Sequence, residues 1–471
     1  ATATMNTAVN SPLVIVTGSG SDVVSGSTGN DVVNGGAGID TIEFVGSVTV
    51  AAGTTAGTFA VTSMDDGSDA VFNVEKLSAA NGEFLLVGNG GFATIQDAVA
   101  VAASGQTIVV AAGNYAGMIT IGAALTNLTI VGLSGAVLNG AFNIAGDGTT
   151  IDGLAIQNGA LVSGSKTAIY LNASDVTLSN LVMTNPTPFD MNTFGIESVF
   201  GADTSGLTIT NVNSTGFQTG LYLNPGAEGT VVSDSSFIGT RAGAGVDSVQ
   251  DLTLTNSTFD GNDLDLELFN IDGTQFVAND NTFVDGAIQN NQYGGQMSGV
   301  LSFGPSTFGG TDYDSLQIGS ANSDVVTSGA GQDYLFGGAG EDSLSGGTGS
   351  DTFAFTVAGQ TATIVATDNG DGVLSNGDTF AGNFDVITDF VSLDNDMIDL
   401  SAINSLAAEG DVFAGLAVDE FQFIRGDFDA GLFTANDAGA DTLLAFDDGT
   451  SDVGVILLGV DSLNENDDFI S

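Results

Sequence analysis

The stretch GAGQDYLFGGAGEDSLSGGTGSDTF, residues 329–353, repeats one short pattern every nine residues. Each unit places a glycine two residues before an aspartate and an apolar residue two residues after it. The aspartates are Asp324, one unit earlier, and Asp333, Asp342 and Asp351, and the glycines are Gly331, Gly340 and Gly349. The apolar positions are Val326, Leu335, Leu344 and Phe353. Such a repeat predicts stacked coils in which one apolar side chain per unit points into a thin core.

The same nine-residue spacing occurs near the start of the chain, in GSGSDVVSGSTGNDVVNGGAGIDTIEF, residues 18–44. Here the aspartates are Asp22, Asp31 and Asp40, and the glycines two residues before them are Gly20, Gly29 and Gly38. A flexible linker rich in Gly and Asp would not keep an apolar residue in phase over all these units. The glycines allow turns with positive φ, and we expect each carboxylate to meet carboxylate and carbonyl oxygens of the next turn around one Ca²⁺ ion.

The charge balance of the 471 residues favours cations as partners. There are 57 acidic and 4 basic residues, which gives a formal net charge of −53. Only Lys76, Lys166, Arg241 and Arg425 could contact phosphates, so we expect no binding to nucleic acid or to anionic membranes. Cys and His are absent, which argues against zinc or copper sites and leaves hard oxygen ligands, the kind that Ca²⁺ prefers.

Neither a membrane segment nor a cleavable leader is expected from the pattern of apolar residues. No run of about 18 apolar residues occurs, so no membrane insertion is predicted. The first residues, ATATMNTAVNSPLVIVTG, lack a basic region and a sustained apolar region, which argues against a secretory signal at this end.

Between the two repeat blocks, short β-branched strands recur at intervals of about 22 to 31 residues, which predicts a solenoid with longer coils. One polar column follows these strands, and we expect its side chains to hydrogen-bond from coil to coil at a buried corner. Its members are Asn180, Asn211, Asp234, Asn256 and Asn279. The stretch 92–117 enters the solenoid with Thr94 and Asp97 in a capping-box arrangement, an Ala/Val helix and a stop at Gly105, so we expect this helix to cover the open end of the first coil.

The nonapeptide blocks resemble the calcium-binding repeats of secreted RTX proteins, with their Gly-Gly-x-Gly-x-Asp-x-U-x pattern. The segment from about 84 to 300 resembles right-handed parallel β-helices of the pectate-lyase-like superfamily, and residues 384–403 resemble the module that caps RTX rolls. The acidic and then apolar tail GVDSLNENDDFIS is similar to type I secretion signals. Together these resemblances imply several Ca²⁺ ions, export from a Gram-negative cell by a type I secretion system, and folding outside the cell.

The predicted fold is therefore all-β: a right-handed parallel β-helix flanked by calcium-binding parallel β-rolls, with a β-rich C-terminal capping module. The expected domains are an N-terminal roll with a short β-segment (1–83), the β-helix with its capping helix (84–310), a second roll (311–355) and the capping module with its secretion-like tail (356–471).

A second type of calcium loop is a further candidate. In TDNGDGVLSNGD, residues 367–378, the residues Asn369, Asp371 and Asp378 fall at ligand positions of an EF-hand loop. The first position should be Asp and the last Glu, whereas this stretch has Thr367 and Asp378. A solvated Asp/Gly turn explains the same residues.

The solenoid contains few of the residues that enzymes acting on polysaccharides require. A lyase needs a base such as Lys or Arg, for which the solenoid offers only Lys166 and Arg241, and the absence of His excludes an Asp-His constellation. Paired carboxylates of a glycosidase could come from the acidic residues of the solenoid, which are Glu197, Asp247, Asp263, Asp265 and Glu267. In the stretch DLDLELF the last three alternate with leucines, which predicts the solvent face of one strand.

These observations favour a secreted, calcium-dependent structural protein that assembles with copies of itself into an extracellular layer, filament or matrix. The alternative is a polysaccharide-active enzyme, such as a lyase, epimerase or glycosidase, or an adhesin that binds cell-surface polysaccharide in a groove of the β-helix. For an enzyme, Lys166, Arg241 and Glu197 are the first candidates.

Overall fold

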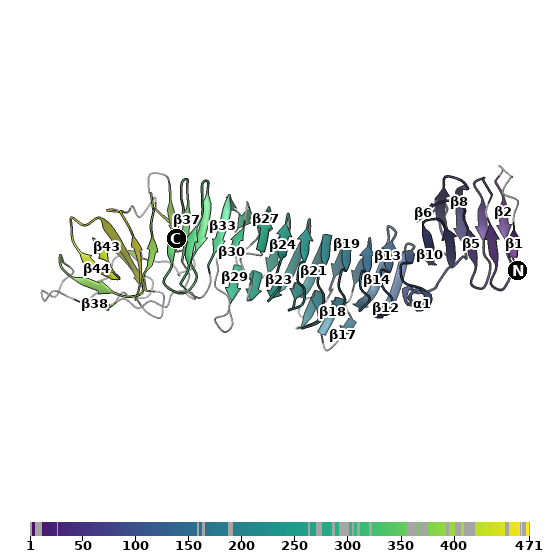
Figure 1. Ribbon diagram of the computed structural model, residues 1–471, viewed down its shortest axis with the longest axis horizontal. Coiled ribbons are helices and arrows are strands. Elements are labelled where there is room, and N and C mark those ends of the chain that lie inside the picture. The colour runs from purple at the N-terminus through teal and green to yellow at the C-terminus, as the bar shows by residue number, and fades with distance from the viewer. Residues whose placement is uncertain are drawn as a thin grey trace. The chain divides into compact units, whose positions relative to one another are not determined.

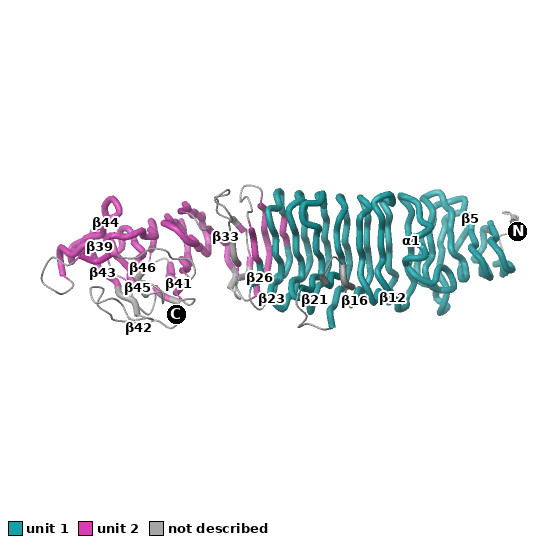
Figure 2. Tube along the Cα trace, turned by 90° about the horizontal axis from the view of Figure 1, so that it is seen from below, with its two compact units in different colours: residues 1–252, 256–266 teal, residues 253–255, 267–471 magenta. Residues whose placement is uncertain are grey.

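The computed structural model describes residues 2–4, 12–25, 27–157, 160–162, 165–186, 192–261, 264–269, 276–284, 288–291, 301–303, 306–308, 311–319, 323–355, 365–367, 375–391, 395–400, 407–408, 420–447, 452–461, 463 and 468–470. Within these residues the chain forms 47 strands and one helix (Figure 1), so the predicted all-β fold is confirmed. The chain divides into two compact units (Figure 2): residues 1–252 with 256–266, and residues 253–255 with 267–471.

Unit 1 begins with a roll of short strands that alternate between two sheets. One sheet is parallel and stacks β1 (Thr2–Thr4), β3 (Val23–Ser25), β5 (Thr41–Glu43) and β9 (Lys76–Ala79). The other stacks β2 (Val14–Val16), β4 (Val32–Asn34) and β8 (Gly67–Phe72) in parallel, and then continues antiparallel into β7 (Phe59–Ser63) and β6 (Val48–Ala52).

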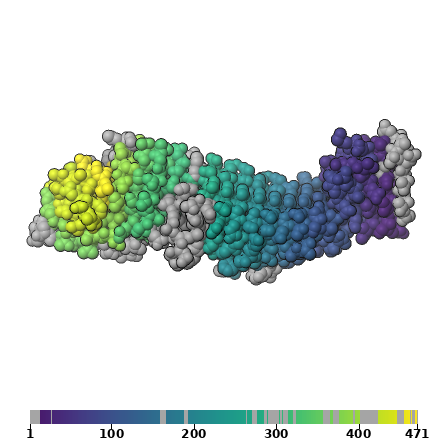
Figure 3. Space-filling model, viewed as in Figure 1, coloured from purple at the N-terminus to yellow at the C-terminus, as the bar shows by residue number. Residues whose placement is uncertain are grey.

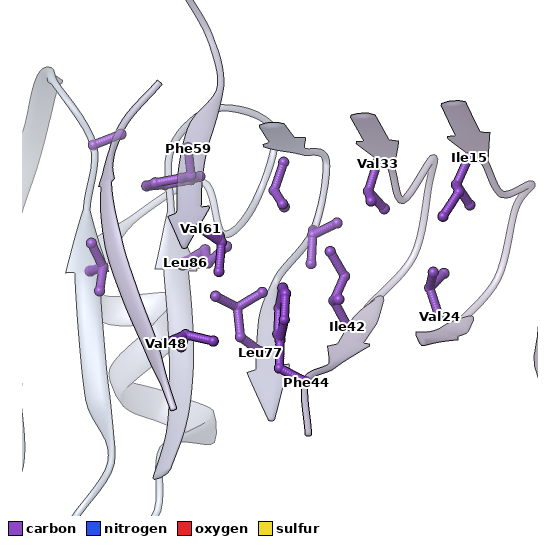
Figure 4. Close-up of a cluster of buried hydrophobic side chains, with 14 residues drawn as sticks. Ile15, Val24, Val33, Ile42, Phe44, Val48, Phe59, Val61, Leu77 and Leu86 are labelled. Carbon is purple, nitrogen blue, oxygen red and sulfur yellow. The ribbon is translucent and has the colours of Figure 1, made fainter. Parts of the chain in front are cut away.

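Paired positions in neighbouring repeat strands of this roll are eighteen residues apart, as Val14 with Val32 and Val23 with Thr41 show. Each nine-residue unit is therefore half a coil, and consecutive units lie on opposite sheets. The apolar residues of the repeat point into the space between the sheets (Figure 4), where Val24, Val33 and Ile42 are at most 1% exposed. This confirms the thin core predicted from the repeat.

Helix α1 (Ile95–Val101) begins where the sequence indicates, since the side chain of Thr94 accepts a hydrogen bond from the backbone N–H of Asp97 (3.0 Å). It ends at Val101 with Ala102 as the C-cap residue, four residues before the predicted stop at Gly105. Gln96 accepts a hydrogen bond from the backbone N–H of Thr120 (2.7 Å) in β12 (Gly113–Ile121), so the helix caps an edge of that strand as expected. Among the described residues no helix is long and apolar enough to cross a membrane.

The rest of unit 1 is a parallel β-helix whose coils stack in sequence order, as the successive colours of Figure 3 show. Strand β9 pairs antiparallel with β10, and β10 pairs with β11 in parallel, so the roll and the β-helix share hydrogen-bonded sheet. The strands are β10 (Gly82–Val87), β11 (Thr107–Val110), β12, β13 (Thr129–Gly132), β14 (Ala136–Ile144), β15 (Thr150–Asp152), β16 (Ala155–Gln157), β17 (Ala160–Val162), β18 (Ser165–Leu171), β19 (Thr177–Thr184), β20 (Thr193–Ser198), β21 (Thr208–Leu223), β22 (Val231–Ser233), β23 (Ser236–Asp247), β24 (Leu252–Thr255, all but its first residue in unit 2), β25 (Thr258–Gly261) and β26 (Leu264–Phe269, divided between the units).

The polar column of the β-helix forms the predicted side-chain ladder, but on the surface rather than at a buried corner. Asn211 donates to Asn180 (2.7 Å), and Asn256 donates to Asp234 (2.6 Å). All four residues have φ between 46° and 54°, the left-handed region that Asn and Asp tolerate better than other side chains. Asn279 ends β27 in unit 2, where the neighbouring Asp280 has the positive φ. Because these short polar side chains are exposed, water can complete the hydrogen bonds that the ladder does not provide.

Unit 2 contains the second roll. Strands β33 (Ser315–Ile318), β35 (Asp333–Phe336) and β37 (Thr352–Ala354) stack in parallel, and β34 (Val325–Thr327) stacks with β36 (Ser343–Ser345). Strands β27 to β32 precede them: β27 (Phe276–Asn279), β28 (Asn281–Phe283), β29 (Ile288–Asn291), β30 (Leu301–Phe303), β31 (Ser306–Phe308) and β32 (Thr311–Tyr313).

Both sheets of the second roll continue past residue 355 into the C-terminal segment. Strand β41 (Met397–Asp399) stacks on β37 and β47 (Phe469–Ile470) stacks on β41, while β40 (Asp385–Ile387) stacks on β36 and β46 (Asp452–Leu457) on β40. Antiparallel strands then extend the second sheet: β45 (Asp441–Asp447), β43 (Glu420–Asp429), β44 (Leu432–Ala435), β39 (Thr379–Ala381) and β38 (Val365–Thr367), with β42 (Ala407–Ala408) beside β43.

Candidate calcium sites

The repeat aspartates lie in the turns at the start of the short roll strands. Their burial is nearly complete, with exposed fractions between 1% and 7%. They are Asp22, Asp31 and Asp40 in the first roll and Asp324, Asp333, Asp342 and Asp351 in the second. Burying so many carboxylates requires partners for their oxygens, because an unsatisfied charged group in the interior is strongly destabilising.

One of these partners is the backbone of the neighbouring coil. The N–H of Asp22 donates to Oδ1 of Asp40 (2.8 Å), and the N–H of Asp324 donates to Oδ1 of Asp342 (2.8 Å). Asp333 donates in the same way to Asp351 (3.1 Å). The aspartates therefore form ladders in steps of eighteen residues, so the carboxylate that lies next in space is the second one along the chain.

The second carboxylate oxygen faces the turn instead. Oδ2 of Asp40 and Oδ2 of Asp342 are buried and have no hydrogen-bond partner among the described residues. Both point at a glycine five residues earlier: a Cβ on Gly35 would lie 2.9 Å from Oδ2 of Asp40, and one on Gly337 would collide with Oδ2 of Asp342. An oxygen that is buried, charged and without a hydrogen-bond donor among the described residues fits a hard cation such as Ca²⁺.

The glycines two residues before the aspartates serve the stacking of the coils. Gly20, Gly38, Gly331, Gly340 and Gly349 have φ between 119° and 139°, which other residues rarely adopt. A Cβ on Gly38 would collide with the carbonyl oxygen of Gly20, and one on Gly349 with that of Gly331. Gly29 occupies the corresponding place before Asp31, and its carbonyl oxygen faces Gly67.

These residues fit a site built from two carboxylates and the carbonyl oxygens of two adjacent turns. Among the described residues no group of three or more acidic side chains converges on one point, which agrees with such a composition. Pairs such as Asp22 with Asp40 and Asp324 with Asp342 would hold the ion. Bound there, Ca²⁺ supplies the positive charge that buried carboxylates lack.

Several carboxylates of the ladders have raised pKa values. Burial, together with the charge of neighbouring carboxylates, raises the pKa of Asp342 to about 8 and the pKa of Asp351 to about 7. Burial likewise raises the pKa of Asp69 to about 7, and it raises the pKa values of Asp40 and Glu75. In the absence of a cation the folded rolls therefore hold protons that an unfolded chain would release.

Sequence reasoning missed four members of the ladders. Asp31 donates its N–H to Asp69 (2.8 Å) and Asp40 donates to Glu75 (2.7 Å), while Asp342 donates to Asp385 (2.8 Å) and Asp351 to Asp396 (3.0 Å). The nine-residue period is broken before each of them. A signal was present nevertheless, because each acceptor is followed two residues later by an apolar residue, as in the repeat: Val71, Leu77, Ile387 and Ile398.

Of the predicted EF-hand-like loop, Asn369 and Asp371 lie outside the described residues. Asp378 is buried, and its Oδ2 accepts a hydrogen bond from the backbone N–H of Ser375 (2.5 Å). The calcium-binding loop over residues 367–378 therefore stays a prediction.

The candidate catalytic residues lie on three strands of one sheet in unit 1. Lys166 in β18 is in register with Thr193 in β20, and Arg241 in β23 lies two strands beyond β20. Three strand spacings separate the backbones of Lys166 and Arg241, roughly 14 Å. Glu197 in β20 lies in register between Tyr170 and Tyr222 and accepts a hydrogen bond from Thr167 (2.7 Å). The backbones that carry these side chains are thus spread along the sheet.

The prediction that the acidic residues of the stretch DLDLELF face solvent is wrong for those that the structure describes. Asp265 and Glu267 are buried, at 0% and 7% exposed, and Leu266 and Leu268 are buried as well. Strand β26 is therefore covered on both faces, which alternation alone does not reveal. Oδ1 of Asp265 accepts a hydrogen bond from the backbone N–H of Gly261 (3.1 Å), which offsets part of the cost of burial. Asp263 lies outside the described residues.

Two protein families match parts of the chain. Residues 14–42 and 318–353 match the RTX calcium-binding nonapeptide repeat, in four copies, and residues 135–304 match the right-handed β-helix region. The chain thus carries RTX calcium-binding repeats and a right-handed parallel β-helix, as the sequence indicated. None of the curated proteins matches it in sequence.

Solved structures with a similar fold are distant. A PL6 alginate lyase in complex with a trisaccharide has 12% identity and a TM-score of 0.34, covering 59% of this chain and 63% of that protein. YbhC of Escherichia coli has 14% identity and a TM-score of 0.27, covering 54% of this chain and 68% of that one. A pectin methylesterase mutant in complex with a hexasaccharide has 13% identity and a TM-score of 0.18, covering 81% and 89%.

The raised pKa values predict how the calcium-free protein responds to pH. Because the folded pKa values of Asp342, Asp351 and Asp69 lie above the unfolded value near 4, the rolls are most stable at low pH and lose stability as the pH rises through about 7 to 8. We expect calcium-free protein to gain β-structure by circular dichroism when the pH falls from 8 to about 5.5. With Ca²⁺ present the same acidification should weaken the rolls, because protons displace the ion. Equal folding of calcium-free protein at both pH values would contradict this account.

Proposed function

We propose that this calcium-binding β-helix protein with RTX repeats is an extracellular structural protein that associates with copies of itself once calcium has folded its rolls. RTX repeats are typical of proteins secreted by type I systems, which supports export in the unfolded state. Low calcium inside the cell leaves the buried carboxylates of the rolls without a partner. Outside, where calcium-binding modules operate at about 10⁻⁴ to 10⁻³ M, the binding free energy becomes folding free energy.

One surface carries the proposal of self-association. We call it the outer face of the N-terminal roll: the side chains of β2, β4, β8, β7 and β6 that point away from the core. Residues in register across the five strands form one apolar row, Val14, Val32, Ala70, Ala60 and Ala51. Flanking positions on the same face are also uncharged: Val16, Asn34, Phe72, Ser68, Thr62 and Thr49.

The lack of carboxylates on this face is unusual for a chain with a net charge of −53. Val14 and Val16 are 76% and 65% exposed, on a strand that pairs with β4. A basic partner protein would bind a surface that is dense in carboxylates, so the uncharged outer face does not suit such a partner. Two copies of this chain repel each other over most of their surface, so they can approach closely where the surface is apolar and uncharged. A second copy is therefore the occupant that we assign to the outer face.

A second candidate function is polysaccharide binding or cleavage on the β-helix. It is favoured by Glu197, which lies in register between Tyr170 and Tyr222, with the ring of Phe194 5.5 Å from that of Tyr222. Carboxylates beside aromatic rings are common in sugar sites. The spread of Lys166, Glu197 and Arg241 over three strands makes catalysis the weaker proposal.

Removal of calcium should abolish rolls and assemblies together. We expect EGTA to reduce the β-signal in circular dichroism and to disperse any layer or filament seen by electron microscopy, with recovery when Ca²⁺ is returned in excess. The physical reason is that the ladders, and with them the outer face, exist only when the carboxylates are neutralised. Assemblies that persist unchanged in EGTA would rule the proposal out.

A carboxylate on the outer face should weaken self-association without unfolding the roll. We expect Val14→Asp to raise the dissociation constant of the self-associated protein by about tenfold or more in millimolar calcium, measured by analytical ultracentrifugation. The matched control is Val182→Asp in β19, which adds the same charge at a position that is 51% exposed. Equal association of both variants and the unaltered chain would show that the outer face is not the interface.

An assay for unsaturated uronates and reducing ends separates the two candidate functions. On alginate and pectate, with calcium present, we expect no product from the purified chain. Product formation that disappears in Lys166→Ala, Arg241→Ala or Glu197→Gln would instead establish the enzymatic alternative.

A further inference from the structure

Each roll ends on acidic residues from a segment that has no nonapeptide repeat. In the first roll these are Asp69 and Glu75, and in the second they are Asp385 and Asp396. All four lie outside the residues that match the RTX repeat, 14–42 and 318–353. Their contact with the last repeats is the same as the contact between repeats, a carboxylate oxygen that accepts the backbone N–H of a repeat aspartate.

The strands that contain or directly follow these residues occupy the place of a further repeat coil. Strand β8 continues the stack of β4, with Val32 opposite Ala70, and β9 continues the stack of β5, with Thr41 opposite Lys76. Strands β40 and β41 continue β36 and β37 in the same way. The apolar residues two positions after the four acids are 0% exposed, like those of the repeat. Coil geometry thus continues where the repeat sequence has ended.

The acids of these final coils are buried as deeply as the repeat aspartates. Asp69 is 1% exposed, Asp385 1%, Asp396 3% and Glu75 7%. Oδ2 of Asp69 is buried without a hydrogen-bond partner among the described residues, as Oδ2 of Asp40 is. Such an oxygen calls for a cation or a proton, because nothing in the surrounding protein balances its charge.

Further oxygens gather beside these acids, at glycines that let the neighbouring coils approach closely. A Cβ on Gly35 would contact both Oδ2 of Asp40 and the carbonyl oxygen of Asn73, two residues before Glu75. A Cβ on Gly67, two residues before Asp69, would lie 2.8 Å from the carbonyl oxygen of Gly29 and 2.9 Å from Oδ1 of Asn30. At both positions a side chain larger than that of glycine would collide with these oxygens and separate them from the acids.

We infer that Asp69, Glu75, Asp385 and Asp396 are calcium ligands, which close the ion ladder of each roll outside the nonapeptide repeats. The pairs are Asp31 with Asp69, Asp40 with Glu75, Asp342 with Asp385 and Asp351 with Asp396. In unit 1 this places an ion beside β9, which pairs with β10, the strand that begins the β-helix ladder with β11. Calcium then orders the junction between roll and β-helix as well as the roll itself.

Counting bound ions in the full chain tests this inference independently of self-association. Asp69→Asn keeps the oxygen that accepts the N–H of Asp31 and removes the charge. We expect it to bind one fewer calcium ion than the unaltered chain in native mass spectrometry, and to need about tenfold more calcium for folding of the first roll. The matched control, Asp65→Asn, changes an exposed aspartate four residues away and should bind the full number. An unchanged ion count in Asp69→Asn would overturn the inference.

Hydrogen exchange in the unaltered chain provides a test that does not depend on the folding of a variant. If Glu75 binds calcium, added Ca²⁺ should slow exchange of the amides of β9 (Lys76–Ala79) at the same calcium concentration as those of β5 (Thr41–Glu43). Protection of β5 without β9 would restrict the ions to the repeats and overturn the inference. Failure of the outer-face variants to weaken association would leave both of these results unaffected.

Discussion

The buried carboxylate is the constraint on which the rolls depend. A coil of eighteen residues buries two aspartates and only two apolar residues of the repeat, so hydrophobic burial is small and the electrostatic cost is large. In Asp40 and Asp342 one carboxylate oxygen accepts the backbone N–H of a neighbouring coil, and the other has no hydrogen-bond partner among the described residues. Folding is therefore tied to neutralisation of these carboxylates, and Ca²⁺ does this with the oxygen ligands that the turns already present.

The β-helix of unit 1 stacks its coils mainly through apolar burial. Its coils are longer and enclose large side chains such as Phe142, Phe217 and Phe237, all at most 1% exposed, so apolar burial supplies the stability. Its polar ladder lies on the surface and is made mostly of Asn amides, as where Asn211 contacts Asn180. The ladders of buried carboxylates thus belong to the rolls and to the segments that close them, whereas the described strands of the β-helix stack around an apolar core.

The inward direction of the roll carboxylates also bears on the proposed self-association. In the first roll the repeat carboxylates are turned inward to the ladder, and the outward positions of β2, β4 and β8 hold Val, Ala, Ser, Asn and Phe. A sheet that satisfies its charges internally can present an uncharged outer face, even in a chain with a large negative charge. In the proposed function, folding by calcium and association through that face are two consequences of one arrangement, since the face exists only when the ladder has formed.

The sequence by itself determined the fold class, the repeat aspartates and glycines, and the calcium chemistry, because the period of nine and the absence of His and Cys leave few alternatives. It also indicated the helix cap at Thr94 and the polar column of the β-helix. Only the tertiary structure decided that the ladder steps by eighteen residues, because consecutive units alternate between two sheets. It also decided that Asp69, Glu75, Asp385 and Asp396 join the ladders, since coil geometry continues through strand pairing after the period is lost. The burial of Asp265 and Glu267 was likewise hidden, because alternation in a strand does not reveal whether its second face is covered.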